Sequence, residues 1–334
     1  MKYRKLGRSN LMVSELCLGA MMFGDQTDES ESARIVDLAR EQGVNFIDTA
    51  DVYTKGASET IVGRCLRPDR HRWVLASKLG NRMSELPNES RYSRKWIVSE
   101  LEASLRRLDT DYLDIYYLHR DYEGDCLEES LRAIDDLIRA GKIRCFGLSN
   151  FRGWRIAEVV RLCERIGMPG PVVCQPYYNL LNRGPEVEIL PACRNYDLGV
   201  AAYSPIARGV LTGKYRPDAP PAEGTRAARG DRRILEAEWR PESLRIAEKL
   251  AVHASAKGVS PLHLACAWLL ASRTVSAVIA GPRTLAQWQE YFAALEVQWD
   301  DADEELIDSL VAPGHPSTPG YSDPQYPLAD RRTA

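Results

Sequence analysis

The chain has 334 residues, of which 44% are hydrophobic and 27% charged, and its formal net charge is −3 at pH 7. This length accommodates one large domain or two ordinary ones, and the apolar content can supply a sizeable core. A net charge so close to zero gives no general attraction to nucleic acid or to anionic membranes. We therefore expect small neutral or anionic molecules as ligands.

The eight cysteines show no Cys-x-x-Cys pair and no histidine spacing that suits zinc. Several lie within apolar runs, where a thiol behaves as a small hydrophobic group. The N-terminus lacks a basic region followed by an apolar stretch, and no run of about 18 apolar residues occurs. These features predict a reduced, cytoplasmic protein with no metal ion and no membrane span, and they are compatible with a homo-oligomer.

In chain order, the first predicted element is a short β-hairpin, formed by residues 2–5 and 11–13 around a turn-rich stretch. Short apolar runs bounded by turn residues follow at 14–19, 44–48, 73–78, 112–119, 143–149, 172–175, 200–204 and 277–281. Stretches of helical period lie between them, for example over 97–108 and 131–138. This alternation predicts an α/β fold, a (β/α)8 TIM barrel whose bottom the hairpin closes.

Residues 216–239, rich in Pro, Gly, Ala and Arg, form a long loop without a periodic pattern between the seventh and eighth strands. Loops of this length commonly cover a site or are disordered, and we expect a mobile cover. The alternation shows no domain boundary. We therefore predict a single barrel domain over 1–334 with a C-terminal tail from about 312.

Four residues that can move or organise a proton lie at the ends of three successive predicted strands: Asp48, Tyr53, Lys78 and His119. Such groups are expensive to desolvate unless solvent or other groups compensate them. Each alone has an ordinary structural explanation, such as a turn cap or a lysine that snorkels to solvent. Because the strand ends of a parallel barrel meet at one mouth, we expect the four to form one catalytic site.

These side chains are suited to protonating a developing alkoxide. A nearby ammonium favours the phenolate, so we expect Lys78 to lower the pKa of Tyr53. Asp48 would keep that ammonium charged and oriented, and His119 would donate to a substrate oxygen. The set contains no hydride source, so a carbonyl reductase would have to bind one as a cofactor.

The later strand ends supply candidate cofactor contacts. An amide group could be hydrogen-bonded by Ser149, Asn150 and Gln175. A nicotinamide ring could stack on the aromatic ring of Tyr203. After the eighth strand, Gly281, Arg283 and Thr284 open a helix, where backbone N–H groups and a guanidinium can meet a phosphate. Barrels of this class favour that location for phosphate.

Several of these stretches together resemble the aldo-keto reductases. They are 46–53, 76–78, 118–119, 147–150, 175–181 and 203–205, and the resemblance extends over about residues 3–310. The chain is most similar to the bacterial branch related to potassium-channel beta subunits. The resemblance implies a (β/α)8 barrel that binds NADPH or NADP⁺ without a Rossmann motif, and the sequence contains no Gly-x-Gly-x-x-Gly.

By this resemblance Tyr53 is the general acid, Lys78 and Asp48 are its partners, and His119 orients the substrate. Ser149, Asn150 and Gln175 would bind the carboxamide, and Tyr203 would stack on the ring. The pyrophosphate loop would consist of Ser204, Ile206, Gly209, Leu211, Gly213 and Lys214. The adenosine-phosphate segment would consist of Gly281, Arg283, Thr284, Gln287 and Glu290. Tyr291 stands where the family often has Asn, so the resemblance does not carry one adenine hydrogen bond over to this chain.

The predicted function is NADPH-dependent, reversible reduction of an aldehyde or ketone. Candidate substrate residues in the mouth loops are Met22, Phe23, Arg82, Arg120 and Tyr177, and the two arginines could admit an anionic carbonyl compound. Two other functions stay open. A Schiff-base lyase would use Lys78 as the nucleophile, which requires a neutral amine. A redox sensor would bind NADPH, report to a partner and turn over slowly.

Overall fold

The computed structural model describes residues 1–326. Contacts within the chain divide it into two compact units, and each is described here by itself. The barrel unit comprises residues 1–177, 187–203 and 272–289, and the second unit comprises 178–186, 204–271 and the residues from 290 onward. The single domain expected over 1–334 stays a prediction, and the last eight residues of the expected tail lie outside the described part.

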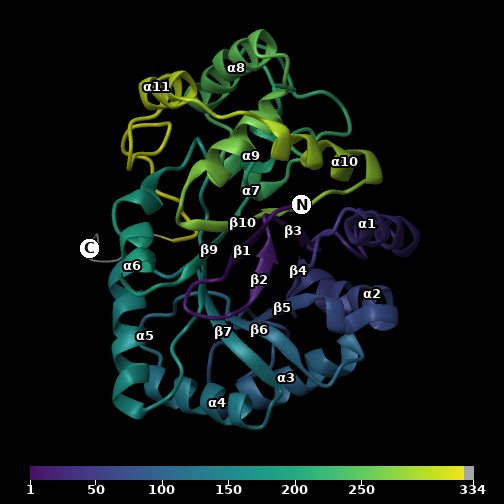
Figure 1. The fold of residues 1–334 in the computed structure, drawn as a ribbon, viewed down its shortest axis with the longest axis vertical. Coiled ribbons are helices and arrows are strands. Elements are labelled where there is room, and N and C mark those ends of the chain that lie inside the picture. The colour runs from purple at the N-terminus through teal and green to yellow at the C-terminus, as the bar shows by residue number, and fades with distance from the viewer. Residues whose placement is uncertain (327–334) are drawn as a thin grey trace. The chain divides into compact units, whose positions relative to one another are not determined.

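The barrel unit contains a hairpin and a closed parallel barrel (Figure 1). Its strands are β1 (Tyr3–Lys5), β2 (Met12–Ser14), β3 (Leu16–Gly19), β4 (Phe46–Asp48), β5 (Val74–Leu79), β6 (Leu113–Leu118), β7 (Ile143–Ser149), β8 (Val173–Gln175), β9 (Gly199–Tyr203) and β10 (Val275–Ala280). The hairpin strands β1 and β2 are antiparallel, and the barrel order is β10, β3, β4, β5, β6, β7, β8, β9. The predicted (β/α)8 fold and the hairpin are confirmed.

Amphipathic helices follow the strands along the chain. In the barrel unit they are α1 (Glu29–Glu41), α2 (Ala57–Leu66), α3 (Arg94–Leu108), α4 (Leu127–Arg139), α5 (Gly153–Ile166) and α6 (Ile189–Asn195), and α10 (Leu285–Ala293) begins there. In α1 the buried residues recur at helical spacing, and the Asp28 side chain accepts from the Glu31 N–H at the N-terminus. Among residues 1–326, none of the helices is long and apolar enough to cross a membrane.

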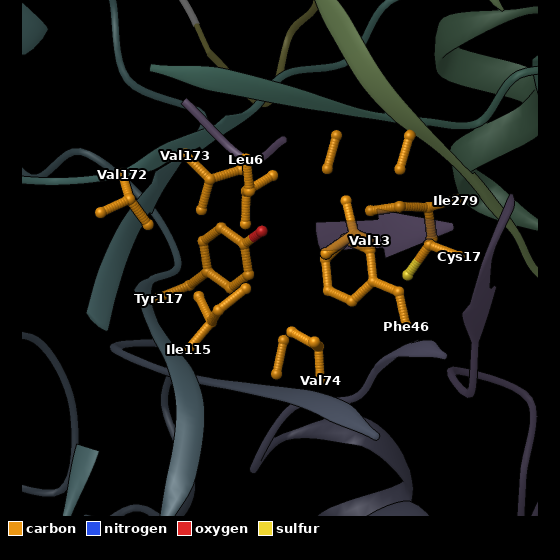
Figure 2. Close-up of a cluster of buried hydrophobic side chains, with 13 residues drawn as sticks. Leu6, Val13, Cys17, Phe46, Val74, Ile115, Tyr117, Val172, Val173 and Ile279 are labelled. Atoms are coloured by element: carbon orange, nitrogen blue, oxygen red, sulfur yellow. The ribbon is translucent and has the colours of Figure 1, made fainter. Parts of the chain in front are cut away.

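The hairpin closes the end of the barrel opposite the carboxyl ends of the strands. Leu6 and Val13 are fully buried and pack in one cluster with inward side chains such as Phe46 and Val74 near the strand starts (Figure 2). Arg4 fixes the hairpin by donating to the Val275 carbonyl at 2.8 Å. The predicted plug is therefore present, and the polar strand ends are left at the other mouth.

The second unit contains α7 (Arg232–Ala237), α8 (Pro241–Ala256), α9 (Pro261–Ala271) and α11 (Asp301–Leu310). The expectation that 216–239 lacks structure is wrong in its second half, where α7 forms. Its N-terminus is capped by Asp231, which accepts from the Ile234 N–H at 3.0 Å, and Ile234 is fully buried. The described tail packs within this unit, where the Arg240 guanidinium lies 3.8 Å from the Tyr321 ring centroid.

A buried polar cluster in the barrel unit is formed by residues of α2, α3 and the loop after β4. Arg107 of α3 donates to Glu59 at 2.6 Å and also pairs with Glu100, so one guanidinium serves two buried carboxylates. Asp51 is fully buried; its Oδ1 accepts from the Val52 N–H, and its Oδ2 has no hydrogen-bond partner among the described residues. Burial, followed by the charges of Glu59 and Glu100, raises the pKa of Asp51 well above its ordinary value.

We expect Asp51→Asn to be at least as stable as the wild type at neutral pH. The folded protein holds the Asp51 proton more tightly than the unfolded chain, so this group destabilises the fold as the pH rises above about 4. The amide cannot ionise, and the stability gained by the variant should grow from pH 5 to pH 8. Each unit by which folding raises the Asp51 pKa corresponds to about 1.4 kcal/mol, which sets the scale.

Urea unfolding of both proteins at the two pH values measures this difference. The exposed Asp111, changed to Asn, is the matched control and should show little change at either pH. A stability loss in Asp51→Asn that is the same at pH 5 and pH 8 would contradict the expected protonation.

Candidate active site

The four predicted catalytic residues all come from the carboxyl ends of neighbouring strands. Asp48 is the last residue of β4, Lys78 lies one residue before the end of β5, and His119 directly follows β6. Tyr53 begins the 3-10 turn η1 (Tyr53–Gly56), which follows β4. Because β4, β5 and β6 pair in parallel in that order, these residues emerge side by side.

The Lys78 ammonium connects three of these groups. It is fully buried, pairs with Asp48 Oδ1, and donates to the Thr49 carbonyl at 2.7 Å and to Tyr53 Oη at 3.2 Å. These contacts use all three of its protons. Burial alone would lower the pKa of Lys78, but Asp48 and Tyr53 together raise it above its ordinary value. The lysine is therefore a charged donor and not a neutral nucleophile.

The backbone after Tyr53 turns sharply to enter α2. Thr54, Lys55 and Gly56 have φ values of 48°, 52° and 90°, so three successive residues are left-handed. Only glycine adopts that region at low cost, and the other two are strained. A Cβ on Gly56 would lie 2.6 Å from Cδ of Arg107. The turn that places the phenol is therefore packed directly against the buried polar cluster.

The expectation that Lys78 lowers the pKa of Tyr53 overall is wrong. Burial raises the pKa of Tyr53, and this effect outweighs the opposing influence of the Lys78 ammonium, so the net shift is upward. The lysine acts in the expected direction but does not produce a phenolate. At neutral pH Tyr53 is a protonated phenol, which is the form that a proton donor requires.

His119 is neutral at the same pH. Burial, followed by the Lys78 charge, lowers the pKa of His119 well below its ordinary value. Its ring lies edge-on to Tyr53 with centroids 5.9 Å apart, and Asn81 Nδ2 lies 3.0 Å from its Nδ1. Sequence reasoning did not single out Asn81 and missed this contact. The available signal was its position three residues after Lys78, at the same strand end.

The predicted carboxamide-binding residues form one hydrogen-bonded group. Asn150 Nδ2 donates to Ser149 Oγ at 3.0 Å and to the His119 carbonyl at 2.9 Å, and its Oδ1 accepts from Tyr203 Oη at 2.8 Å. Ser149 Oγ donates to the Gln175 carbonyl at 3.1 Å. The structure thus gathers donors, acceptors and one aromatic ring beside the catalytic group.

Gln175 also contacts the catalytic group directly. Its Nε2 donates to Asp48 Oδ2 at 2.9 Å, and both side chains are buried. Asp48 thereby has a partner on each oxygen, Lys78 on one and Gln175 on the other. One amide links the Asp48 carboxylate to the residues predicted to hold the nicotinamide.

The helix start after β10 carries part of the predicted phosphate segment. Its barrel-unit members are Gly281, Arg283, Thr284 and Gln287. The Arg283 N–H donates to Gln287 Oε1 at 2.9 Å, and Thr284 Oγ1 accepts from the Gln287 N–H at 3.2 Å. Glu31 accepts from the Leu285 N–H at 2.6 Å, so one backbone donor of α10 is already used. A phosphate here would depend mainly on the Arg283 guanidinium.

The remaining predicted cofactor residues lie in the second unit: Ser204, Ile206, Gly209, Leu211, Gly213, Lys214 and Glu290. The loop that carries most of them has left-handed residues at Ser204, Arg208 and Gly209, and Arg208 pairs with the buried Glu238 at 2.8 Å. Tyr291 is buried. The assembly of these residues with those of the barrel unit into one cofactor site stays a prediction.

The predicted apolar substrate residues differ in accessibility. Phe23 is fully buried and Met22 is 8% exposed, so neither side chain is accessible to a substrate. Tyr177 is partly exposed, and its ring centroid lies 5.7 Å from that of Tyr203.

The two candidate arginines also differ. Arg82 is exposed and committed to its own loop, where it donates to the Ser84 carbonyl at 2.8 Å and pairs with Glu85 at 3.0 Å. Arg120 is half-buried beside His119, and its guanidinium lies 5.8 Å from the Tyr122 ring centroid. Of the two, Arg120 is the better placed to meet an anionic substrate group.

Comparison with known proteins supports the same interpretation. The sequence model of the "Aldo/keto reductase family" matches residues 15–312. A rice protein named "Probable voltage-gated potassium channel subunit beta" is 38% identical over 304 residues, which cover 89% of this chain and 92% of that protein. The Bacillus subtilis "Uncharacterized oxidoreductase YrpG" is 34% identical over 334 residues, covering 96% and 100%.

An Alternaria alternata protein named "Aldo-keto reductase AMT2" is 31% identical over 338 residues, which cover 92% of this chain and 90% of that protein. The match of the family model spans most of the chain, and the relatives align over nearly their whole lengths. Together with the closed parallel barrel and its hairpin, these comparisons establish that the chain belongs to the aldo-keto reductase family.

Proposed function

We propose that this protein reduces an aldehyde or ketone to the alcohol with NADPH, reversibly, and that Tyr53 supplies the proton. The observation that carries the proposal is the hydrogen bond from the fully buried Lys78 ammonium to the Tyr53 hydroxyl, with Asp48 holding the ammonium. Family membership implies oxidoreductase chemistry. The cytoplasmic location and a homo-oligomeric state stay predictions from the sequence.

The donor set of the barrel unit suits a nicotinamide cofactor. Ser149, Asn150 and Gln175 offer amide and hydroxyl groups of the kind that bind a carboxamide, and Tyr203 offers a ring on which to stack. When bound, such a cofactor supplies the hydride that this chain lacks. Gln175 would then join the cofactor to Asp48 through one side chain.

The chain's own residues account for the proton. As negative charge develops on the substrate oxygen, the Tyr53 O–H can transfer its proton there, and the Lys78 ammonium stabilises the phenolate that results. The neutral His119 can donate a hydrogen bond to the same oxygen and position it. In the alcohol-oxidising direction the same phenolate would accept the proton.

A slow redox sensor that reports to a partner is the second candidate, because two relatives from rice and Arabidopsis are named channel beta subunits. Turnover separates the two functions. We expect NADPH oxidation with members of a panel of aldehydes, ketones and sugars at ordinary enzyme rates of about 1 s⁻¹ or faster. Cofactor binding without turnover on any member would favour the sensor.

Tyr53→Phe should abolish carbonyl reduction while leaving NADPH affinity nearly unchanged. The hydroxyl is needed only as charge develops, so its loss should lower the rate of the chemical step by about a hundredfold or more. Single-turnover kinetics and a fluorescence titration with NADPH measure the two quantities. Lys78→Met should act similarly, and Tyr3→Phe, on the exposed hairpin, is the control. Reduction by Tyr53→Phe within a few-fold of wild type would make another group the proton donor.

Arg283→Ala should weaken NADPH far more than NADH. Only NADPH carries the 2′-phosphate that this guanidinium would meet in a charge-assisted pair worth about 1.5–3 kcal/mol. That energy corresponds to about a tenfold to hundredfold change in Kd. Parallel titrations with both cofactors measure it, and the exposed Arg82, changed to Ala, is the matched control. Equal weakening of both cofactors would remove Arg283 from this role.

A further inference from the structure

The imidazole of His119 has one nitrogen committed to the protein. Asn81 Nδ2 lies 3.0 Å from Nδ1, within hydrogen-bond distance. Tyr53 packs against the ring in a T-shaped contact with centroids 5.9 Å apart, and the Lys78 charge acts on the ring electrostatically. His119 keeps part of its surface exposed, so Nε2 is the ring nitrogen left for a substrate.

The amide of Asn81 decides which nitrogen carries the proton. An amide N–H can only donate, and a neutral imidazole has one donor and one acceptor nitrogen. The Tyr122 hydroxyl donates toward two oxygens, the Gly80 carbonyl at 3.0 Å and Asn81 Oδ1 at 3.4 Å. The amide oxygen therefore lies toward this hydroxyl, and the amide nitrogen lies toward His119. With Nδ1 accepting from Asn81, the imidazole proton lies on Nε2.

We propose that Asn81 is a positioning residue that holds His119 as the Nε2–H tautomer, so that a neutral imidazole donates to the substrate carbonyl oxygen. This inference rests on the proposed function. Two residues would then have different roles at the substrate oxygen: Tyr53 transfers a proton to it, and His119 only donates a hydrogen bond to it. Burial, followed by the Lys78 charge, disfavours an imidazolium, so without Asn81 the neutral ring is free to carry its proton on Nδ1 and present a lone pair to the substrate oxygen.

Two substitutions at position 81 separate this role from simple packing. Asn81→Leu removes the donor and frees Nδ1 to carry the proton. Asn81→Asp keeps the shape but places an acceptor at Nδ1, which draws a proton there and raises the pKa of the ring. In that variant Nε2–H persists only while His119 is doubly protonated. Asn88→Asp, at an exposed position of the same loop, is the matched control.

The direct test is two-bond ¹H–¹⁵N NMR of the histidine side chains in the full-length protein, with His119→Asn used to assign the His119 signals. We expect the Nε2–H tautomer in the wild type and in Asn88→Asp between pH 6 and pH 8. Asn81→Leu should show a substantial Nδ1–H population, and Asn81→Asp should show a doubly protonated ring at the acid end. An Nδ1–H ring in the wild type would overturn the proposal, as would an unchanged tautomer in both Asn81 variants.

Enzyme kinetics give a second measurement, which separates loss of the His119 tautomer from a general loss of folded protein. For an aldehyde that the wild type reduces, Asn81→Leu should lower kcat about tenfold or more and leave NADPH affinity unchanged. Asn81→Asp should lose activity as the pH rises through the raised His119 pKa, a limb that the wild type and Asn88→Asp lack. A flat profile for Asn81→Asp would count against the tautomer role. The NMR result is independent of turnover, so failure of the reductase proposal would be recognised separately.

Discussion

The buried ammonium of Lys78 is the charge on which the rest of the mouth depends. A lysine with no exposed surface is unstable in an apolar barrel unless its protons are all donated, and here Asp48, the Thr49 carbonyl and Tyr53 receive them. These contacts join the end of β4 to β5 and hold the phenol beside them. The same contacts that make the buried charge tolerable therefore also form the arrangement that we propose to be catalytic.

Around the ion pair of Lys78 and Asp48, two further titratable groups are held neutral. Burial keeps Tyr53 a phenol, and burial with the Lys78 charge keeps His119 an imidazole. Elsewhere in the barrel unit, burial, followed by the charges of Glu59 and Glu100, raises the pKa of Asp51. A charged lysine next to neutral donors is the arrangement that favours negative charge on a substrate oxygen without competing for it. Through its amide, Gln175 extends this arrangement to the residues expected to hold the nicotinamide.

The sequence alone predicted the barrel because alternating buried strands and amphipathic helices leave periodic patterns, and residues 143–149 were placed with the bounds that β7 shows. The helix at 232–237 was missed because six residues are too few to establish a period. The bond from Gln175 to Asp48 joins residues 127 apart in sequence, and it exists only once the barrel closes. The contact of Asn81 with His119 depends on the paths of two loops, which no local pattern reports.

The packing of Gly56 against Arg107 ties the catalytic turn to a helix surface far along the chain. The space where a side chain at 56 would begin is filled by the stem of this arginine, whose guanidinium is held by Glu59 and Glu100. A side chain at 56 would therefore meet two obstacles, the arginine stem and the left-handed backbone with φ of 90°. In related sequences, a residue larger than glycine at 56 should coincide both with a shorter side chain at 107 and with a changed turn, and loss of the arginine should also relax the demand for the two acids.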